Sequence, residues 1–377
     1  MTKLSRSLGL LLIASAVGLS VTTGRGLAEE DEARELGERV LQLYQDYEPR
    51  SMLQTPEHPI SRARFPVADV HCHWNTEVAP EALVADMDRL GIAYAVNLSG
   101  GWGDQLDALL ERYERSAPDR FEVLVNIDFS EIDRPDFGPR WAGILERAQA
   151  NGAAGLKIFK TLGLTIKDGT GELVRIDDPR LDPIWAKCGE LGMPVLIHSA
   201  DPLAFFQPID RFNERLMQLG RHPDWSFHGP QFPSREEVLA QRNRVLAKHP
   251  GTTFIGAHLG GHAENLAALG RTLDRHPNLV VDISGRVAEL GRQPYTARRF
   301  FLRYADRILF GTDRYPGRAS QPRHRVYFRF LETDDEYFEY HEHDFPPTGE
   351  WRIHGIFLPD DVLESVYHLN ADKLFRR

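Results

Sequence analysis

Short apolar segments alternate with longer amphipathic segments along most of this chain. The apolar segments are rich in Val, Ile and Leu, which is typical of strands buried on both faces. Strands are predicted at residues 67–73, 94–98, 122–128, 154–159, 194–198, 253–258, 279–283 and 307–311. Helices are predicted between and after them, at residues 80–90, 104–116, 141–151, 181–191, 235–249, 263–276, 296–305 and 360–368.

Eight strands, each followed by a helical segment, predict a closed (β/α)8 TIM barrel. An open doubly wound sheet is the alternative. Its dinucleotide-binding form carries Gly-x-Gly-x-x-Gly after the first strand, whereas His73-Trp74-Asn75 stands there in this chain. Long loops follow the fifth strand, at residues 201–234, and the eighth, at residues 314–359. Loops of this length in a compact domain are usually lids or binding loops.

The first 28 residues are predicted to be a secretory signal peptide. Lys3 and Arg6 precede an apolar stretch at residues 8–21, and small side chains precede the predicted cleavage after Ala28. The stretch is shorter than the roughly 20 residues that span a bilayer. The predicted organisation is therefore a signal peptide at 1–28, an N-terminal helix (29–47) and linker at 29–64, and a barrel at 65–377. We expect a secreted or periplasmic protein with no membrane span after cleavage.

Charge and cysteine content narrow the possible partners. Cleavage would leave 42 basic and 55 acidic side chains, a net charge of −13 with histidine neutral. This excess of acid argues against a nucleic-acid partner, because phosphate binding requires a basic face. A small molecule is the expected partner, and assembly into a homodimer is left open. The two cysteines, Cys72 and Cys188, lie on different predicted elements and are expected to be free, buried thiols.

Four predicted strands end in side chains that can bind a metal. These side chains are His71 and His73 on the first strand, His198 on the fifth, His258 on the sixth and Asp313 after the eighth. In a barrel the carboxyl ends of all strands surround one mouth, where active sites lie. Neutral imidazoles and a carboxylate suit a divalent transition ion. Strand alternation also predicts that residues 69, 71 and 73 share one face and that Cys72 takes the other.

Five motifs resemble those of the amidohydrolase superfamily. They are Asp69-x-His71-x-His73, Gly155-Leu156-Lys157, Pro194-Val195-Leu196-Ile197-His198, Ala257-His258-Leu259-Gly260-Gly261 and Gly311-Thr312-Asp313. The resemblance extends from Val67 to about Leu374. It is in particular to the branch that holds metal-dependent hydrolases, lactonases and the aminocarboxymuconate-semialdehyde and resorcylate decarboxylases.

The resemblance implies a ligand set as well as a barrel. By analogy His71, His73, His198 and Asp313 hold one divalent ion, most often zinc, with manganese as an alternative. His258 then stands just outside these ligands and assists the water or the substrate. In chemical terms such a cation lowers the pKa of water, Asp313 can accept a proton, and His258 can polarise a scissile carbonyl. The alternative for His258 is a core histidine bonded to backbone.

Lys157 and Trp74 are the candidate substrate-binding residues. Alternation places Lys157 on the same face as Gly155 and Phe159, and an inward lysine is costly unless it is paired. We favour a charge partner for a substrate carboxylate or a site acid. A carbamylated bridge to a second metal and an outward lysine that reaches solvent are the alternatives. Trp74 follows the histidine pair and is expected to wall the pocket, with plain packing as its alternative.

These observations predict a mononuclear metal-dependent hydrolase that cleaves an amide, lactone or related ester bond. The first alternative keeps the site and changes the reaction to non-oxidative decarboxylation of an aromatic or unsaturated acid. The alternative from another class is a non-catalytic protein that uses the metal to hold a ligand. A serine hydrolase has no support, because the chain lacks the Gly-x-Ser-x-Gly elbow.

Overall fold

The computed structural model describes residues 25–45, 51–315, 323–341 and 348–376. The chain divides into two compact units, residues 1–55 and 56–377. In the first unit, helix α1 spans Arg25–Gln45, and its side chains from residue 31 to residue 40 are exposed. This helix begins four residues before the predicted one. Most of the predicted signal peptide, residues 1–24, lies outside the described residues.

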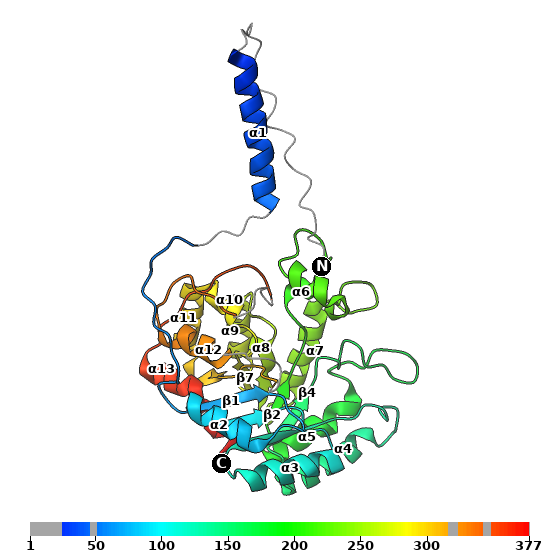
Figure 1. The fold of residues 1–377 in the computed structure, drawn as a ribbon. Helices are drawn as coiled ribbons and strands as arrows, with labels where there is room; N and C mark the ends of the chain where they lie inside the picture. The colour runs from blue at the N-terminus through cyan, green and yellow to red at the C-terminus, as the bar shows by residue number, and fades with distance from the viewer. Residues whose placement is uncertain (1–24, 46–50, 316–322, 342–347, 377) are drawn as a thin grey trace. The chain divides into compact units, whose positions relative to one another are not determined.

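The second unit is built on a single sheet of eight parallel strands in sequential order (Figure 1). The strands are β1 Val67–Cys72, β2 Ile92–Asn97, β3 Phe121–Asn126, β4 Gly155–Ile158, β5 Val195–Ile197, β6 Phe254–Gly256, β7 Leu279–Asp282 and β8 Ile308–Leu309. Each strand overlaps the residue range predicted for it. The predicted (β/α)8 barrel is confirmed.

Helices surround the sheet, as Figure 1 shows. They are α2 Pro80–Leu90, α3 Asp104–Ser116, α4 Phe137–Ala150, α5 Asp182–Leu191, α6 Leu216–Arg221, α7 Arg235–Lys248, α8 Ala257–Gly260, α9 Leu266–Arg275, α10 Val287–Gly291, α11 Pro294–Arg303, α12 Arg323–Glu332, α13 Asp360–Glu364 and α14 Asn370–Phe375. A π-helical turn, Ser365–Leu369, joins the last two, so the final helical segment is longer than predicted. Among the described helices, none is long and apolar enough to cross a lipid bilayer.

Two apolar clusters fill the barrel unit. The larger one lies between the strands and the surrounding helices. The smaller one lies inside the barrel, where Ala68, Val70 and Leu196 pack with Ala371 and Phe375 of α14. The interior near α14 is therefore a packed core, and the cavity described below opens at the opposite end, at the carboxyl ends of the strands.

β1 departs from the alternation that the sequence predicts. Its pairing with β2 shifts register between Asp69 and Cys72, which marks a β-bulge. Beyond the bulge, His71 and His73 face the barrel mouth, whereas Asp69 lies with Cys72 in a small cavity beneath α2. The predicted common face for residues 69, 71 and 73 is thus wrong for Asp69. Cys72 packs in the outer core as expected, and both cysteines are free and buried.

The seam between β8 and β1 closes the barrel next to the candidate ligands. The backbone N–H of Val70 donates to the carbonyl of Phe310 at 3.1 Å, and the N–H of Asp313 donates to the carbonyl of His71 at 2.8 Å. Asp69 reinforces this seam, because its carboxylate accepts hydrogen bonds from the Thr312 hydroxyl at 2.6 Å and from the Thr312 N–H at 3.1 Å. The backbone of His71 is thereby held against that of Asp313.

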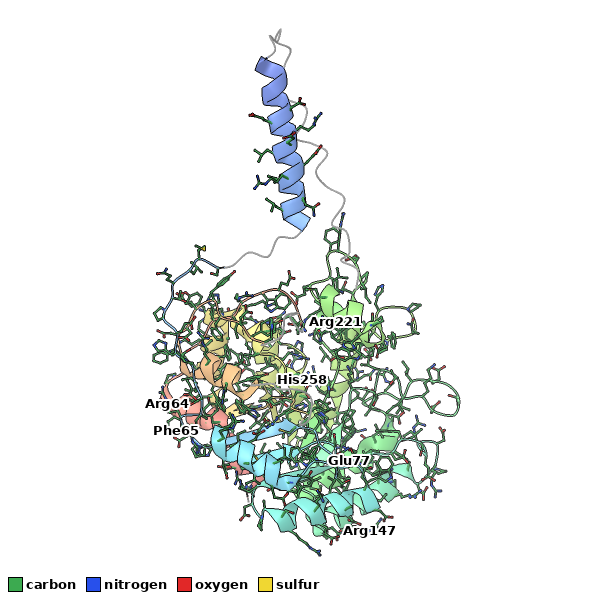
Figure 2. All side chains as sticks on the ribbon, in the orientation of Figure 1. Arg64, Phe65, Glu77, Arg147, Arg221 and His258 are labelled. Carbon is green, nitrogen blue, oxygen red and sulfur yellow. The ribbon has the colours of Figure 1, made fainter. Side chains whose placement is uncertain are left out.

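The segment at residues 56–64 belongs to the barrel unit and is attached to its surface. The His58 N–H donates to the Asp335 carboxylate at 2.8 Å. The Arg64 guanidinium donates to Asp360 of α13 at 2.6 Å, and Figure 2 shows Arg64 and Phe65 beside this helix. The segment therefore follows the barrel wall before β1 begins.

Candidate metal centre and active site

A cavity of about 510 Å³ opens at the carboxyl ends of the strands. It contains the predicted site residues His71, His73, His198, His258 and Asp313, together with Lys157. Figure 2 shows His258 in the middle of the barrel unit, inside the ring of helices. The five strand-end side chains predicted from sequence thus line one cavity, although they are spread over more than 240 residues of chain.

Three of these side chains form a close group of candidate metal ligands. One ligand atom each from His71, His73 and Asp313 lies within 4.8 Å of the other two. The Asp313 Oδ1 atom is 3.6 Å from Nε2 of His71 and 3.3 Å from Nε2 of His73. Donors at zinc–ligand distances of ~2.0–2.1 Å in a tetrahedron lie roughly 3.3–3.4 Å apart. The observed spacing is therefore that of atoms able to share one ion.

Hydrogen bonds fix the orientation of the His71 and His73 imidazoles. Nδ1 of His71 lies 2.9 Å from Oδ2 of Asp282, and Nδ1 of His73 lies 2.8 Å from the Ser99 hydroxyl. An ionised carboxylate only accepts hydrogen bonds, so Nδ1 of His71 carries the proton and its Nε2 keeps a lone pair toward Asp313. A partner on the far nitrogen of a metal-binding histidine is the usual way in which proteins orient such ligands.

The protonation states also fit a cation. Burial lowers the pKa of His73 and of His198 to about 4, so both imidazoles are neutral donors near neutral pH. Burial alone would raise the pKa of Asp313, but the hydrogen bond from His73 and the nearby His71 and His258 hold it well below its usual range. Imidazole nitrogens and a carboxylate oxygen are among the donors that zinc takes in proteins.

His198, the fourth predicted donor, follows β5 and lies outside this close group. Its Nε2 is buried and has no hydrogen-bond partner among the described residues, and the closest acid oxygen, Oδ1 of Asp201, is 3.4 Å away. Its ring centroid is 4.4 Å from that of His258. A buried ring nitrogen without a partner is costly, and coordination to an ion would satisfy it.

His258 is held in a strained turn directly after β6. His258, Leu259, Gly260 and Gly261 have φ angles of 56°, 58°, 55° and 73°, so α8 contains a turn of left-handed helix. For residues with a Cβ atom this conformation costs roughly 1–2 kcal/mol each. Such strain persists only where surrounding contacts impose it, and it is concentrated at functional sites.

Two buried arginines of α7 hold this turn. The Arg242 guanidinium donates to the Gly260 carbonyl, and the Arg235 guanidinium donates to the Gly261 carbonyl. Arg242 is fully buried, and desolvation lowers its pKa to about 10. The turn therefore places the His258 ring by means of contacts from a neighbouring helix.

The hydrogen bonds of His258 fix its tautomer. Nδ1 lies 2.7 Å from the Ser284 carbonyl oxygen, which can only accept, so Nδ1 carries the proton. Nε2 is left with a lone pair. Burial, together with the nearby His198 and Arg286, keeps the pKa of His258 well below its usual value, so the ring is neutral near neutral pH.

A family model described as amidohydrolase matches residues 62–377. The chain belongs to the amidohydrolase family. None of the curated proteins matches it in sequence.

Solved structures that resemble this amidohydrolase include decarboxylases. The 2,6-dihydroxybenzoate decarboxylase from Rhizobium has a TM-score of 0.52 and 16% identity, with 83% of this chain and 99% of that chain covered. A dihydroxybenzoic acid decarboxylase from Polaromonas sp. JS666, with bound manganese and the inhibitor 2-nitroresorcinol, has a TM-score of 0.52 and 16% identity, with 83% and 97% covered. At this identity the similarity shows the fold.

Lys157 of the amidohydrolase barrel points inward, as alternation predicts. Its side chain is 1% exposed, and its Nζ atom has no hydrogen-bond partner among the described residues. Desolvation lowers its pKa to about 8, although the charges of Asp282 and Asp313 oppose this shift. The outward, solvated lysine is therefore excluded, and the amine is available to a ligand.

Trp74 does not line the cavity, which corrects its predicted role as a pocket wall. It is buried in the outer layer, where its ring centroid lies 5.6 Å from those of Tyr113 and Phe121. The residues at 72 and 74 face away from the mouth, so packing was the correct alternative. In the loop after β5, Trp225 lines the cavity, whereas His228 is exposed and does not.

Sequence reasoning missed several residues of the amidohydrolase site. Asp282 ends β7, is fully buried, and accepts hydrogen bonds from His71, from the His258 N–H at 2.9 Å and from Ser284. The search for metal-binding side chains at strand ends could have found it. Tyr315, whose ring stacks on His73 with centroids 4.5 Å apart, and Arg286 line the cavity from loops that carry no sequence signal.

Asp282 also forms a second acid and histidine group with His71 and His258. Its hydrogen-bonding atoms are already in use, because Nδ1 of His71 bonds Asp282 and Nδ1 of His258 bonds Ser284. This group is therefore a hydrogen-bond network behind the ligands. The other ring nitrogen of His71, Nε2, faces Asp313 and would be the one to bind an ion.

Proposed function

We propose that this amidohydrolase is a metal-dependent hydrolase that cleaves an amide, lactone or related ester bond. The observation that carries this proposal is the combination of convergent ligand atoms with a neutral His258 whose free Nε2 faces the same cavity. Hydrolysis requires a proton acceptor near the reacting water, and this arrangement supplies one.

The proposed ligands are His71, His73, His198 and Asp313, with zinc as the preferred ion and manganese as the alternative. If these residues hold a divalent ion, it would lower the pKa of water and polarise a carbonyl oxygen. Asp313 and His258 are the candidate proton acceptors. The buried ammonium of Lys157 can hold a substrate carboxylate or stabilise negative charge that develops on oxygen.

The test is turnover by purified protein loaded with one equivalent of zinc or manganese. The substrates are panels of lactones, arylamides, esters and phenolic acids. Hydrolysis predicts a new acid product with no release of carbon dioxide. We expect turnover to be lost on chelation and to return when metal is added. Asp313→Asn should abolish turnover with either metal. Tight metal retention without turnover on any panel would instead favour a ligand-binding protein.

Decarboxylation is the second candidate, and a specific observation favours it. Lys157 is a buried cation without a partner among the described residues. It lines the same cavity as the candidate ligands, where it could hold a carboxylate for cleavage. Two proteins of similar fold are named as dihydroxybenzoate decarboxylases. Carbon dioxide released from a phenolic acid, with no hydrolysis of the ester and amide panels, would reverse our choice.

A further inference from the structure

A second cavity of about 420 Å³ lies beside the candidate active site, at the ends of β2, β3 and β4. Its wall is formed by Trp102 from the loop after β2, residues 127–130 from the loop after β3, and residues on and after β4. The proposed chemistry uses no residue of the first two loops. Apart from Lys157, no residue that lines this cavity has a role in the function proposed above.

The two cavities share Lys157 and Phe159, which line both. The Phe159 ring is stacked with the His73 ring, and their centroids lie 6.2 Å apart. The Nζ atom of Lys157 is 5.3 Å from the centre of the same ring. A molecule that extends past Phe159 could therefore contact both cavities at once.

Aromatic side chains of the second cavity are exposed to solvent. Trp102 is 45% exposed and Phe159 is 37% exposed, and the partly buried Phe129 joins them in the wall. Exposed apolar surface that is grouped around a concavity marks a binding site more often than single exposed side chains do. Rings of this kind bind flat apolar groups by stacking and by burial of area.

Apart from Lys157, the charged side chains of the wall are hydrogen-bonded to a neighbour or exposed to solvent. Both carboxylate oxygens of Asp128 accept hydrogen bonds from Ser130, each at 2.9 Å, from its N–H and its hydroxyl. Lys167 is exposed. Lys157 is the buried polar side chain without a partner among the described wall residues, and it stands at the boundary with the main site.

We infer that the second cavity is a subsite for an aromatic part of the substrate, whose acidic or carbonyl oxygen meets Lys157. This inference rests on the proposed function and deepens it, because it names the substrate class as aryl-substituted acids or their derivatives. The scissile group then lies at the candidate metal centre, and the ring lies against Trp102 and Phe159.

The test measures binding and requires no turnover. Zinc-loaded protein is titrated by calorimetry with propanoate and with 3-phenylpropanoate, which differ by one phenyl ring. Burial of that ring should make the aryl acid bind roughly 10-fold to 100-fold more tightly. In Trp102→Ala the ratio should fall to about 3-fold or less, because the stacking surface is lost, while the affinity for propanoate is unchanged.

Two further variants complete the experiment. Lys157→Met should weaken the binding of both acids, because it removes the cation that they share. Tyr295→Ala is the matched control, since Tyr295 is 78% exposed on α11 and lines neither cavity, and it should leave both affinities unchanged.

Other results would overturn the inference. Equal affinities of the two acids in the wild type would exclude an aryl subsite. A preference that survives Trp102→Ala would place the ring elsewhere. Since the readout is affinity, the subsite can fail while metal-dependent hydrolysis holds, and hydrolysis can fail while the aryl preference is observed.

Discussion

At the scale of single residues, the site depends on side chains that do not contact the candidate ion. Asp282 receives hydrogen bonds from His71, from the backbone of His258 and from Ser284, so one carboxylate positions a ligand and a proton acceptor together. Its environment supports the charge that this role requires. Burial alone would raise the pKa of Asp282, but the neighbouring imidazole of His71 holds it below its usual range.

Asp282→Asn should weaken metal binding by roughly 10-fold to 100-fold, because the amide can donate to Nδ1 of His71 and favour the wrong tautomer. The measurement is competition for zinc with a chromophoric chelator. Asp274→Asn is the control, since Asp274 bonds Arg303 on the surface. Unchanged affinity in the Asp282 variant would show that His71 needs no anionic partner.

His258→Ala should keep one equivalent of metal and lose roughly 100-fold or more in kcat, as expected for a group that transfers a proton. Elemental analysis and steady-state kinetics on the same preparation separate the two effects. His228→Ala, which alters an exposed histidine outside the cavity, should behave as wild type. Near-normal turnover without His258 would return it to the role of a core histidine.

His198→Ala should hold less than one equivalent of metal, because it removes the donor that lies across the cavity from β1. Elemental analysis after gel filtration gives the count. Full retention would exclude His198 from the ligands and leave the ion to His71, His73 and Asp313.

At the scale of elements, the decisive feature is the left-handed turn after β6. Alternation along a strand cannot place His258, because the strand ends at Gly256 and the ring direction is set by positive φ angles. Arg242 and Arg235 of α7 stabilise this turn by donating hydrogen bonds to two of its carbonyls. The active-site ring is therefore positioned by a helix that contributes nothing else to the cavity.

Arg242→Met should reduce kcat and destabilise the fold by about 1–3 kcal/mol, the usual cost of leaving a buried polar group without its partner. Arg242→Lys should recover part of both, since an ammonium can still reach a carbonyl. Urea unfolding and the split between kcat and KM distinguish positioning of His258 from a general loss of stability. A normal kcat in a destabilised Arg242→Met would refute the positioning role.

His262, which directly follows this turn, should make the free energy of unfolding depend on pH. Burial, with the charges of Arg242 and Arg235, lowers the pKa of His262 to about 3. In the unfolded chain this pKa is ~6.5, so between these values the unfolded state binds more protons and stability falls as the pH falls. His262→Gln should lose less stability than wild type between pH 7 and pH 5 in urea titrations. Equal losses would contradict the prediction.

At the scale of the whole molecule, the candidate ligands join the first and last strands of the barrel. β8 has only two residues in regular pairing, and the seam depends on the backbone bonds of Val70 and Asp313 and on the contact between Asp69 and Thr312. His324 of α12 adds a bond to the same carboxylate at 2.8 Å. An ion shared by His71, His73 and Asp313 would strengthen this closure.

Removal of metal by a chelator should therefore lower the Tm, because an ion that binds only the folded state stabilises it by mass action. Zinc addition should restore the Tm. In His198→Ala the difference in Tm between chelated and zinc-loaded protein should be smaller than in the wild type. Identical melting curves with and without chelator for the wild type would show that no ion is bound at this seam.

The sequence by itself determined the barrel and the five strand-end side chains. Strands buried on both faces produce continuous apolar runs, and parallel strands bring their carboxyl ends to one mouth whatever the separation along the chain. The orientation of Lys157 followed from simple alternation. These features depend on the local pattern of residues and on the topology of the fold, and both can be inferred from the amino-acid sequence.

The tertiary structure alone decided the orientation of the Asp69 side chain and the backbone strain at His258. It also decided the hydrogen-bonding role of Asp282 and the presence of the second cavity beside Lys157. A bulge in β1, a left-handed turn and contacts between loops of different strands each override the regular period of a strand. Their physical cause lies in packing and hydrogen bonds between segments that are distant in sequence. Trp74 shows the difference most simply: it adjoins the ligand pair along the chain, yet in space it packs behind the strand.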